Sequence, residues 1–305
     1  MNALVIGVAF TDIKGFPFHE YIPTGTNHGC VTTTHGGVAR NVAENLANLG
    51  VNVNFPLLLD NNALGNEIKG RLEGAGVDLS DAVIVDNAGV GIWLAVFNEK
   101  GDLAGSISQM PDVEPLNEML RGKGEELVKK ADFVVCEFDT SEYIAERTVE
   151  LAEKYGKPVY VIVGNMNIIL ARRDLMARTR CMIMNNVEAG RLFETDLLDL
   201  SPEDTLDVVL RRGQELGLRA ATVTLGARGC VYADFQTGES GVLPAENCRV
   251  EDTTGAGDAF FSAQVTALSM GASLPDSCRK GSRMAALVLG TTESACPKVG
   301  MDFFR

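Results

Sequence analysis

Residues 252–260 read Asp-Thr-Thr-Gly-Ala-Gly-Asp-Ala-Phe and run directly into a helical pattern. Gly255 and Gly257 allow a tight turn that leaves the backbone amides uncovered. Those amides point outward at a helix N-terminus, where the helix dipole favours anions. Asp258 lies in the first turn, where a carboxylate can take a proton from a hydroxyl that attacks a phosphoryl group. By itself, a single carboxylate there also fits a plain helix cap.

Strands and helices alternate along most of the chain before this stretch. Short β-rich runs occur at 3–6, 52–59, 133–136, 159–163, 182–184 and 221–224. Helical patterns occupy 38–49, 66–75, 118–130, 141–155, 187–194, 205–216 and 259–270. Glycines stand where helix C-caps are expected, at 50, 156, 217 and 271. The alternation predicts one α/β domain over residues 1–305, with a mostly parallel sheet covered by helices on both faces.

Two segments interrupt the alternation. Residues 11–35 contain five glycines and prolines among β-branched residues, and residues 91–110 read as strand, turn and strand. Neither fits a βαβ unit. We expect the two segments, at about 11–35 and 88–112, to form a small β-sheet that covers a ligand as a lid. A decorative edge sheet is the alternative.

Composition excludes several classes of partner. The formal net charge of −14, without a Lys/Arg cluster, makes nucleic acid polymers and anionic membranes poor partners. No run approaches the 18 apolar residues of a membrane span, and the apolar N-terminus lacks the basic region of a signal peptide. The seven scattered cysteines fit buried thiols of a reducing compartment. A cytoplasmic protein is expected.

A second glycine motif lies at residues 36–50, Gly-Gly-Val-Ala-Arg-Asn-Val-Ala-Glu-Asn-Leu-Ala-Asn-Leu-Gly. Gly36 and Gly37 let a ligand approach the backbone, and Asn41 offers a donor and an acceptor to vicinal hydroxyls. Shorter motifs are Asp12 after the first strand, Asn185-Asn186-Val187-Glu188 where a strand enters a helix, and Thr224-Leu225-Gly226-Ala227-Arg228-Gly229. Each alone fits an ordinary turn or helix cap.

In this order, from about Asp12 to about Pro297, the motifs resemble those of the ribokinase-like carbohydrate kinases, also called the phosphofructokinase-B family. The resemblance implies a three-layer α/β/α sandwich with a β-sheet lid. It also implies transfer of a phosphoryl group from ATP, with Mg²⁺, to a hydroxyl of a small sugar or nucleoside. No Walker A motif, G-x-x-x-x-G-K-[ST], occurs in the chain, so a P-loop lysine is not available.

The resemblance also implies roles for individual residues. Asp258 is the catalytic base, and the amides of Gly255, Ala256 and Gly257 form the anion hole for the transferring group. The acceptor is held by Asp12, Gly36, Gly37 and Asn41. The nucleotide is held by Asn185, Thr224, Gly226, Gly229 and Ser282. Glu188 holds Mg²⁺ through water, and Asp252 and Thr254 support a K⁺ ion, as in some members.

The acceptor predicted first is pseudouridine, phosphorylated at its 5′-hydroxyl. Arg40, immediately before Asn41, and the stretch 108–110 look most like the pseudouridine kinases, whereas Asp252 departs from those that carry Asn there. Ribose or another nucleoside is the alternative. A keto-acid sugar is disfavoured because no Arg pair is evident to hold its carboxylate. Besides this small molecule, a second copy of the chain, bound through the lid, is the expected partner.

Two functions of other classes fit the sequence less well. A nicotinamide-dependent dehydrogenase is disfavoured because residues 7–12, Gly-Val-Ala-Phe-Thr-Asp, lack G-x-G-x-x-G after the first strand. An inactive kinase-like ligand sensor would be marked by loss of the base or of the anion-hole glycines, and this chain retains both.

Overall fold

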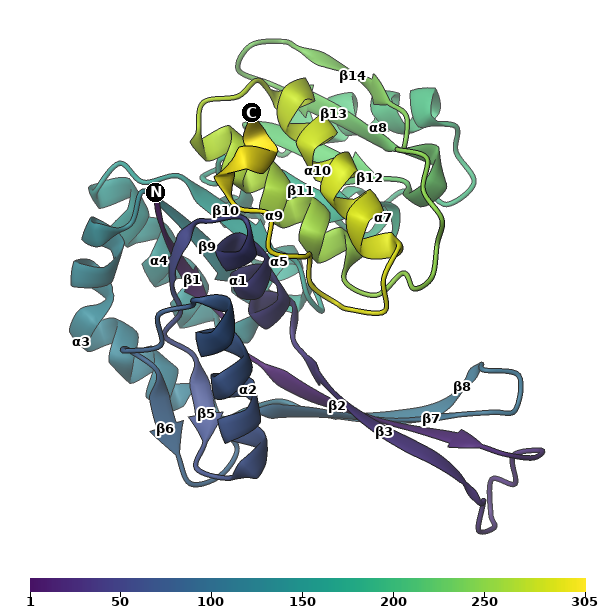
Figure 1. Cartoon of the computed structure of the whole chain (residues 1–305). Coiled ribbons are helices and arrows are strands. Elements are labelled where there is room, and N and C mark those ends of the chain that lie inside the picture. Colours follow the sequence, from purple (N-terminus) through teal and green to yellow (C-terminus); the bar gives the residue numbers. More distant parts are fainter.

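The computed structural model describes the whole chain, Met1–Arg305, and its centre is a twisted sheet (Figure 1). One half is parallel, in the order β10-β9-β1-β4, and the other half is mixed, in the order β11-β12-β13-β14. An isolated parallel bridge between Tyr160 and Cys181 joins them. The strands are β1 (Asn2–Ile6), β4 (Asn52–Asn54), β9 (Phe133–Glu137), β10 (Val159–Ile162), β11 (Met182–Asn185), β12 (Ala220–Thr224), β13 (Cys230–Asp234) and β14 (Ser240–Leu243).

Helices cover both faces of the sheet, because successive side chains of each strand point to opposite faces. Leu4 and Ile6 pack with one helical layer, whereas Ala3 and Val5 pack with the other. The first layer contains α3 (Glu114–Lys130), α4 (Glu142–Lys154), α7 (Asn186–Phe193) and α8 (Pro202–Glu215). The second contains α1 (Val38–Asn48), α2 (Ala63–Ala75), α9 (Ala256–Ser269) and α10 (Leu274–Leu289). The predicted three-layer sandwich is confirmed.

A separate four-stranded sheet projects from the sandwich (Figure 1). Its order is β3-β2-β7-β8, and its strands are β2 (Phe10–Pro17), β3 (Gly29–Gly36), β7 (Gly91–Phe97) and β8 (Leu103–Gln109). Strands β2 and β7 pair in parallel, which joins the two segments that interrupt the alternation. The predicted small sheet therefore exists, and we call it the lid.

Several elements differ from the prediction. The run at 52–59 is two strands, β4 and β5 (Leu58–Asp60), because Pro56 cannot donate to a ladder. β5 pairs with β6 (Val83–Val85) in a small sheet of its own. The strands β13 and β14 and the helix α10 were not predicted, nor were the short helices α5 (Asn167–Ala171) and α6 (Arg173–Met176). The glycines predicted to follow helices all have positive φ.

All seven cysteines are free thiols. Five are buried as expected, but Cys30 on the lid and Cys248 after β14 are exposed, so the expectation of buried thiols is wrong for these two. No helix of the chain has the length and apolar character needed to cross a bilayer.

Candidate active site

Helices α1 and α9 bring Asn41 and Asp258 together close to the point where lid strand β3 leads into α1. The Nδ2 of Asn41 donates a 2.6 Å hydrogen bond to Oδ2 of Asp258. Both helices begin at a glycine, Gly37 and Gly255, without a side-chain cap. By contrast, α2, α4, α7, α8 and α10 begin with an Asn or Ser that accepts a first-turn amide. The starts of α1 and α9 are therefore left free to bind a ligand.

The turn before α9 has the geometry of an anion site. Gly255 has a φ of +80°, and a side chain there would collide with the carbonyl oxygen of Ser294, so only glycine fits. Two backbone bonds cross this turn, from Ala256 N–H to Thr253 O over 3.4 Å and from Ala259 N–H to Gly255 O over 2.9 Å. The Ala256 amide, predicted to join the anion hole, therefore already has an acceptor in the chain. The N–H groups of Gly257 and Asp258 have no acceptor within the chain. They lie at the positive end of the helix dipole.

Burial raises the pKa of the Asp258 carboxyl to about 7, the Glu188 charge raises it further, and the Asn41 hydrogen bond and the Arg40 charge both oppose the shift. A carboxyl whose pKa lies near neutrality is suited to general base catalysis.

A second raised carboxyl belongs to Glu137, at the end of β9. Burial raises its pKa to about 7, although the Val8 N–H donates to it over 3.1 Å, and the charges of Asp139 and Asp258 add to the rise. Sequence reasoning missed Glu137. The available signal was a carboxylate directly after a fully buried strand, because ligands of such sheets bind beyond the carboxyl ends of the strands.

The predicted acceptor residues lie at the root of the lid. A Cβ on Gly36 would stand 2.6 Å from Oδ1 of Asp12, and one on Gly37 would stand 2.8 Å from the Val8 carbonyl oxygen. Both glycines are thus needed for close packing. Burial raises the pKa of Asp12, opposed by the charges of Lys14 and Arg40. The structure brings Asp12, Gly36 and Gly37 together beside Asn41.

Four of the five predicted nucleotide residues line one cavity of about 530 Å³ between β12, the 245–250 segment and α10, whereas Asn185 lines a smaller hollow beside it. The lining of the larger cavity includes Thr224, Gly226, Gly229, Ser282 and Gly257. Gly229, with a φ of +88°, packs against the Leu243 carbonyl, so this turn also requires glycine. The cavity therefore reaches from the anion-binding turn to the position predicted to lie beside adenine.

A smaller hollow of about 150 Å³ adjoins this cavity and is lined by Asn185, Glu188, Thr224, Gly257 and Asp258. Asn185 and Glu188 form a reciprocal capping box at the start of α7, with both bonds at 2.9 Å. Asn185 and Glu188 therefore do cap helix α7, as the alternative interpretation of this motif predicts. Only Oε2 of Glu188 takes part, so Oε1 remains for another ligand. Hard carboxylate oxygens match the preference of Mg²⁺, so the donor set fits this ion.

Asp252 and Thr254 lie just before the anion-binding turn. The Thr254 N–H donates to Oδ1 of Asp252 over 2.8 Å, and this bond holds the pKa of Asp252 below its usual value. The structure brings these two residues next to each other and shows no cluster of acidic or soft ligands there.

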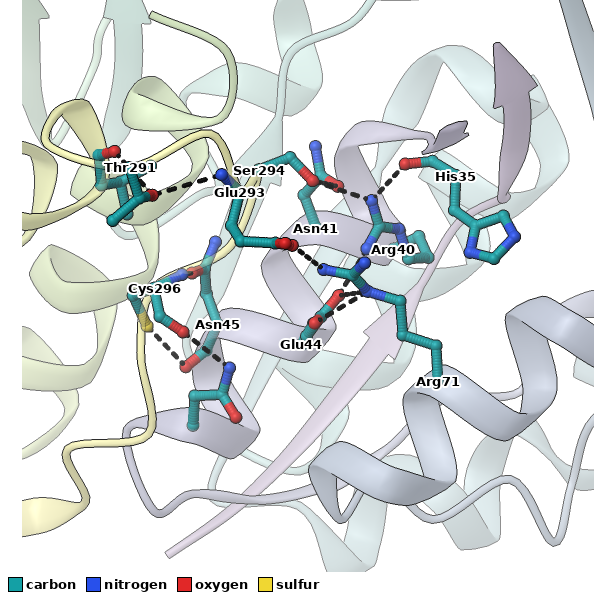
Figure 2. Close-up of polar contacts among 12 residues, drawn as sticks. His35, Arg40, Asn41, Glu44, Asn45, Arg71, Thr291, Glu293, Ser294 and Cys296 are labelled. Atoms are coloured by element: carbon teal, nitrogen blue, oxygen red, sulfur yellow. Dashed lines mark hydrogen bonds and ion pairs between the residues drawn. The ribbon is translucent and has the colours of Figure 1, made fainter. Parts of the chain in front are cut away.

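Arg40 is the other residue whose role sequence reasoning missed. Its side chain is fully buried and forms an ion pair with Glu44, which also binds Arg71 over 3.0 Å. Arg71 in turn binds Glu293 over 2.9 Å (Figure 2). A polar network thus ties α1 and α2 to the loop after α10.

This fold and site define the class of kinases that phosphorylate a hydroxyl on a small molecule. The chain belongs to the PfkB family of carbohydrate kinases, whose model matches residues 3–298. It is a sugar or nucleoside kinase with a ribokinase-like fold.

Relatives of this chain carry several names. It is 33% identical to a guanosine-inosine kinase of Exiguobacterium acetylicum, with 96% of each chain covered. It is 24% identical to a pseudouridine kinase of Escherichia coli, with 85% of this chain and 80% of the relative covered. Its fold matches the structure of Arabidopsis thaliana ribokinase complexed with ribose and ATP, with a TM-score of 0.84, 23% identity, and 99% and 98% of the chains covered.

Proposed function

We propose that this protein transfers the γ-phosphoryl group of ATP to the 5′-hydroxyl of a purine ribonucleoside, guanosine or inosine. The observation that carries the transfer is the Asn41–Asp258 pair beside the uncapped turn at Gly255. The 33% identity to a guanosine-inosine kinase over nearly the whole of both chains supports the choice of acceptor.

The lid offers a surface for a nucleobase. Trp93, the only tryptophan of the chain, is paired with Asp12 across β2 and β7, so both side chains point to the same face of the lid. The Nζ of Lys14 lies 5.9 Å from the centre of the Trp93 ring on that face. Neighbouring strands are about 4.8 Å apart. One nucleoside can therefore place ribose hydroxyls on Asp12 and its base on the indole.

Pseudouridine, the acceptor favoured by the sequence, is the second candidate. Arg40 before Asn41 supports it, as does the 24% identity to a pseudouridine kinase. Both candidates place a base on Trp93, but a bicyclic purine offers the indole more area for stacking. Free ribose has no base to stack on Trp93, which is why a nucleoside ranks above a sugar.

In the proposed mechanism, Asp258 accepts the proton of the 5′-hydroxyl as that oxygen attacks the γ-phosphorus. The bond from phosphorus to the β,γ-bridging oxygen breaks, and ADP leaves. The N–H groups of Gly257 and Asp258, with Gly255 and Ala256 shaping the turn, stabilise the charge on the transferring group. Asn41 and the Gly36–Gly37 backbone orient the acceptor, and Glu137 is a further candidate to bind its hydroxyls.

Two ions fit this proposal. Mg²⁺, held by Glu188 through water beside Asn185, would neutralise phosphate charge in a site without a P-loop lysine. K⁺ supported by Asp252 and Thr254 would lie behind the anion-binding turn. ATP would occupy the 530 Å³ cavity, with its base near Ser282.

The lid supports a homodimer as the quaternary state. Apolar side chains stand exposed along it, including Val31 and Ile107 at 69% exposure each and Leu94 at 41%. Exposed apolar surface of this kind marks an interaction site. A second copy covering these residues would account for their exposure in the single chain.

The test compares kcat/KM for guanosine, inosine, pseudouridine, adenosine, uridine, ribose and fructose with ATP and Mg²⁺. We expect a purine ribonucleoside to be preferred by at least about tenfold. Preference for pseudouridine would select the second candidate. Preference for ribose or fructose would overturn the nucleoside assignment and leave the family assignment intact, and no turnover with any acceptor would favour a ligand sensor.

A further inference from the structure

Ser294, in the loop after α10, lies between the buried Arg40 and the acceptor residue Asn41 (Figure 2). The Nη2 of Arg40 donates to Oγ of Ser294 over 3.2 Å. The Ser294 hydroxyl donates to Oδ1 of Asn41 over 3.5 Å, and Nδ2 of Asn41 donates to Oδ2 of Asp258 over 2.6 Å. These three hydrogen bonds form a chain from a permanent positive charge to the candidate base.

The first bond of this chain has a fixed direction. A guanidinium has donors only, so the Ser294 hydroxyl accepts from Arg40 and directs its own proton elsewhere. Arg40 itself is held rigidly, because it also donates to the carbonyl oxygens of His35 (2.5 Å) and Gly36 (3.4 Å) and pairs with Glu44. Because Nε, Nη1 and Nη2 of Arg40 each donate to an acceptor within the chain, the guanidinium is fixed, and the position of Nη2 is fixed with it.

We propose that Arg40 and Ser294 are positioning residues, which hold the Asn41 amide in the orientation that donates to Asp258. This inference rests on the proposed role of Asp258 as the base.

The amide orientation matters because it selects one form of the carboxyl. In the observed orientation, Nδ2 of Asn41 faces Asp258 and favours the ionised carboxylate, the form that accepts a proton. Turned by half a revolution, Oδ1 would face Asp258 and favour the protonated acid. The Ser294 hydroxyl stabilises the observed orientation by donating to Oδ1. Arg40 on α1 also acts on Asp258 by its charge, as do Glu188 on α7 and Glu137 at the end of β9.

The loop that carries Ser294 is anchored by its neighbours. The Cys296 N–H donates to Oδ1 of Asn45 over 2.6 Å, and Nδ2 of Asn48 donates to the Cys296 carbonyl over 2.8 Å. The Ser294 carbonyl packs against Gly255 in the anion-binding turn. Ser294→Ala leaves these backbone contacts intact, so this substitution tests the hydroxyl alone.

The experiment measures kcat/KM against pH for the full-length Ser294→Ala and Ser294→Thr variants with the preferred acceptor. For Ser294→Ala we expect kcat/KM to fall about 3- to 30-fold near pH 7, which is the cost of one positioning hydrogen bond. We also expect the acid limb of the pH profile, where kcat/KM rises with pH, to shift to higher pH. Ser294→Thr keeps the hydroxyl and restores both. The apparent KM for ATP stays unchanged.

Thr291→Val is the matched control, because Thr291 has a hydroxyl in the same loop that donates to the Val288 carbonyl over 3.0 Å rather than to Asn41. It should lower thermal stability slightly and leave the acid limb in place. A Ser294→Ala enzyme with a wild-type rate and an unshifted acid limb overturns the positioning role. Asp258→Asn, measured alongside, separates the two hypotheses: if it retains turnover, the proposed base is wrong, whatever Ser294 does.

Discussion

Asn41 and Asp258 are 217 positions apart in the chain, and their side chains meet in a 2.6 Å hydrogen bond between α1 and α9. Each helix begins at a glycine turn without a side-chain cap. The bond therefore joins the two glycine motifs of the sequence into one site. It also places the residue proposed to orient the acceptor in contact with the residue proposed to deprotonate it.

Asp258→Asn should fold normally and lose phosphoryl transfer. Loss of a general base typically costs about 10²–10⁴-fold in rate, while the isosteric amide preserves any role as a first-turn residue of α9. Circular dichroism and kcat with the preferred acceptor check this. Asp276→Asn is the control, because Asp276 holds the same first-turn position in α10 and binds only Ser273 and Arg279. Near wild-type turnover in Asp258→Asn would show that Asp258 is structural.

Glu188→Gln should raise the Mg²⁺ concentration needed for half-maximal rate and spare acceptor affinity. Gln keeps an oxygen that can accept the Asn185 N–H, so the capping box survives while the charge facing the small hollow is lost. Initial rates over a Mg²⁺ series, with acceptor KM measured at saturating metal, check this. An unchanged Mg²⁺ dependence would assign Glu188 to the cap alone.

Trp93 should report nucleoside binding directly. Because the chain has no other tryptophan, its fluorescence comes from this lid residue, and a stacked base should quench it. Base stacking on an aromatic side chain contributes about 1–3 kcal/mol, so Trp93→Ala should raise nucleoside KM about 5- to 150-fold and spare the KM for ATP. Leu94→Ala is the control, since Leu94 points to the opposite face of the lid. Unchanged fluorescence at saturating nucleoside would show that the bound base does not stack on Trp93.

Glu137→Gln should stabilise the protein at alkaline pH. Since the folded-state pKa of Glu137 is raised to about 7, the folded state holds this proton more tightly than the unfolded chain. Its contribution to the free energy of unfolding is therefore full below about pH 4 and is lost as pH rises through 7. At pH 8, we expect Glu137→Gln to unfold with a free energy higher by roughly 1–3 kcal/mol, and at pH 4 to match the wild type. Chemical denaturation at the two pH values measures this, and equal effects at both would contradict the titration.

Val31→Asp combined with Ile107→Asp should dissociate the proposed dimer. Both side chains are exposed on the lid, so charges there cost the monomer little but oppose burial against a second copy. Sedimentation velocity of wild type and variant gives the answer. A wild-type protein that sediments as a monomer at micromolar concentration would rule out the lid dimer.

Much of the fold was predictable because strands and helices leave periodic patterns. The sandwich and the lid segments follow from alternation and its interruption. Helix α10 was missed because polar and charged residues stand among its apolar ones, although Ser273 and Gly290 mark its ends. The split of the 52–59 run had a visible signal in Pro56.

The motif residues were predictable, but their partners were not. Asp12, Asn41 and Asp258 stand in recognisable motifs, whereas Glu137 is one carboxylate after one buried strand. The polar network of Arg40, Glu44, Arg71 and Glu293 is completed by a contact between Arg71 and Glu293, which are 222 positions apart. No local pattern encodes such a pairing, so only the folded structure reveals it.

Strands β10 and β11 are paired only by the isolated bridge between Tyr160 and Cys181, so the central sheet has little strand pairing at this boundary. Asp12 and Asn41, proposed to bind the acceptor, lie on one side of this boundary, and the proposed nucleotide cavity lies on the other. Asp258 of α9 accepts the hydrogen bond from Asn41 of α1, so a side-chain contact also links the two sides. The two halves nevertheless share both hydrophobic cores, because buried residues of β1 and β9 pack with those of β11 and β12 on each face of the sheet. The helical layers, rather than the strand ladder, therefore fix the distance between the proposed acceptor residues and the proposed nucleotide cavity.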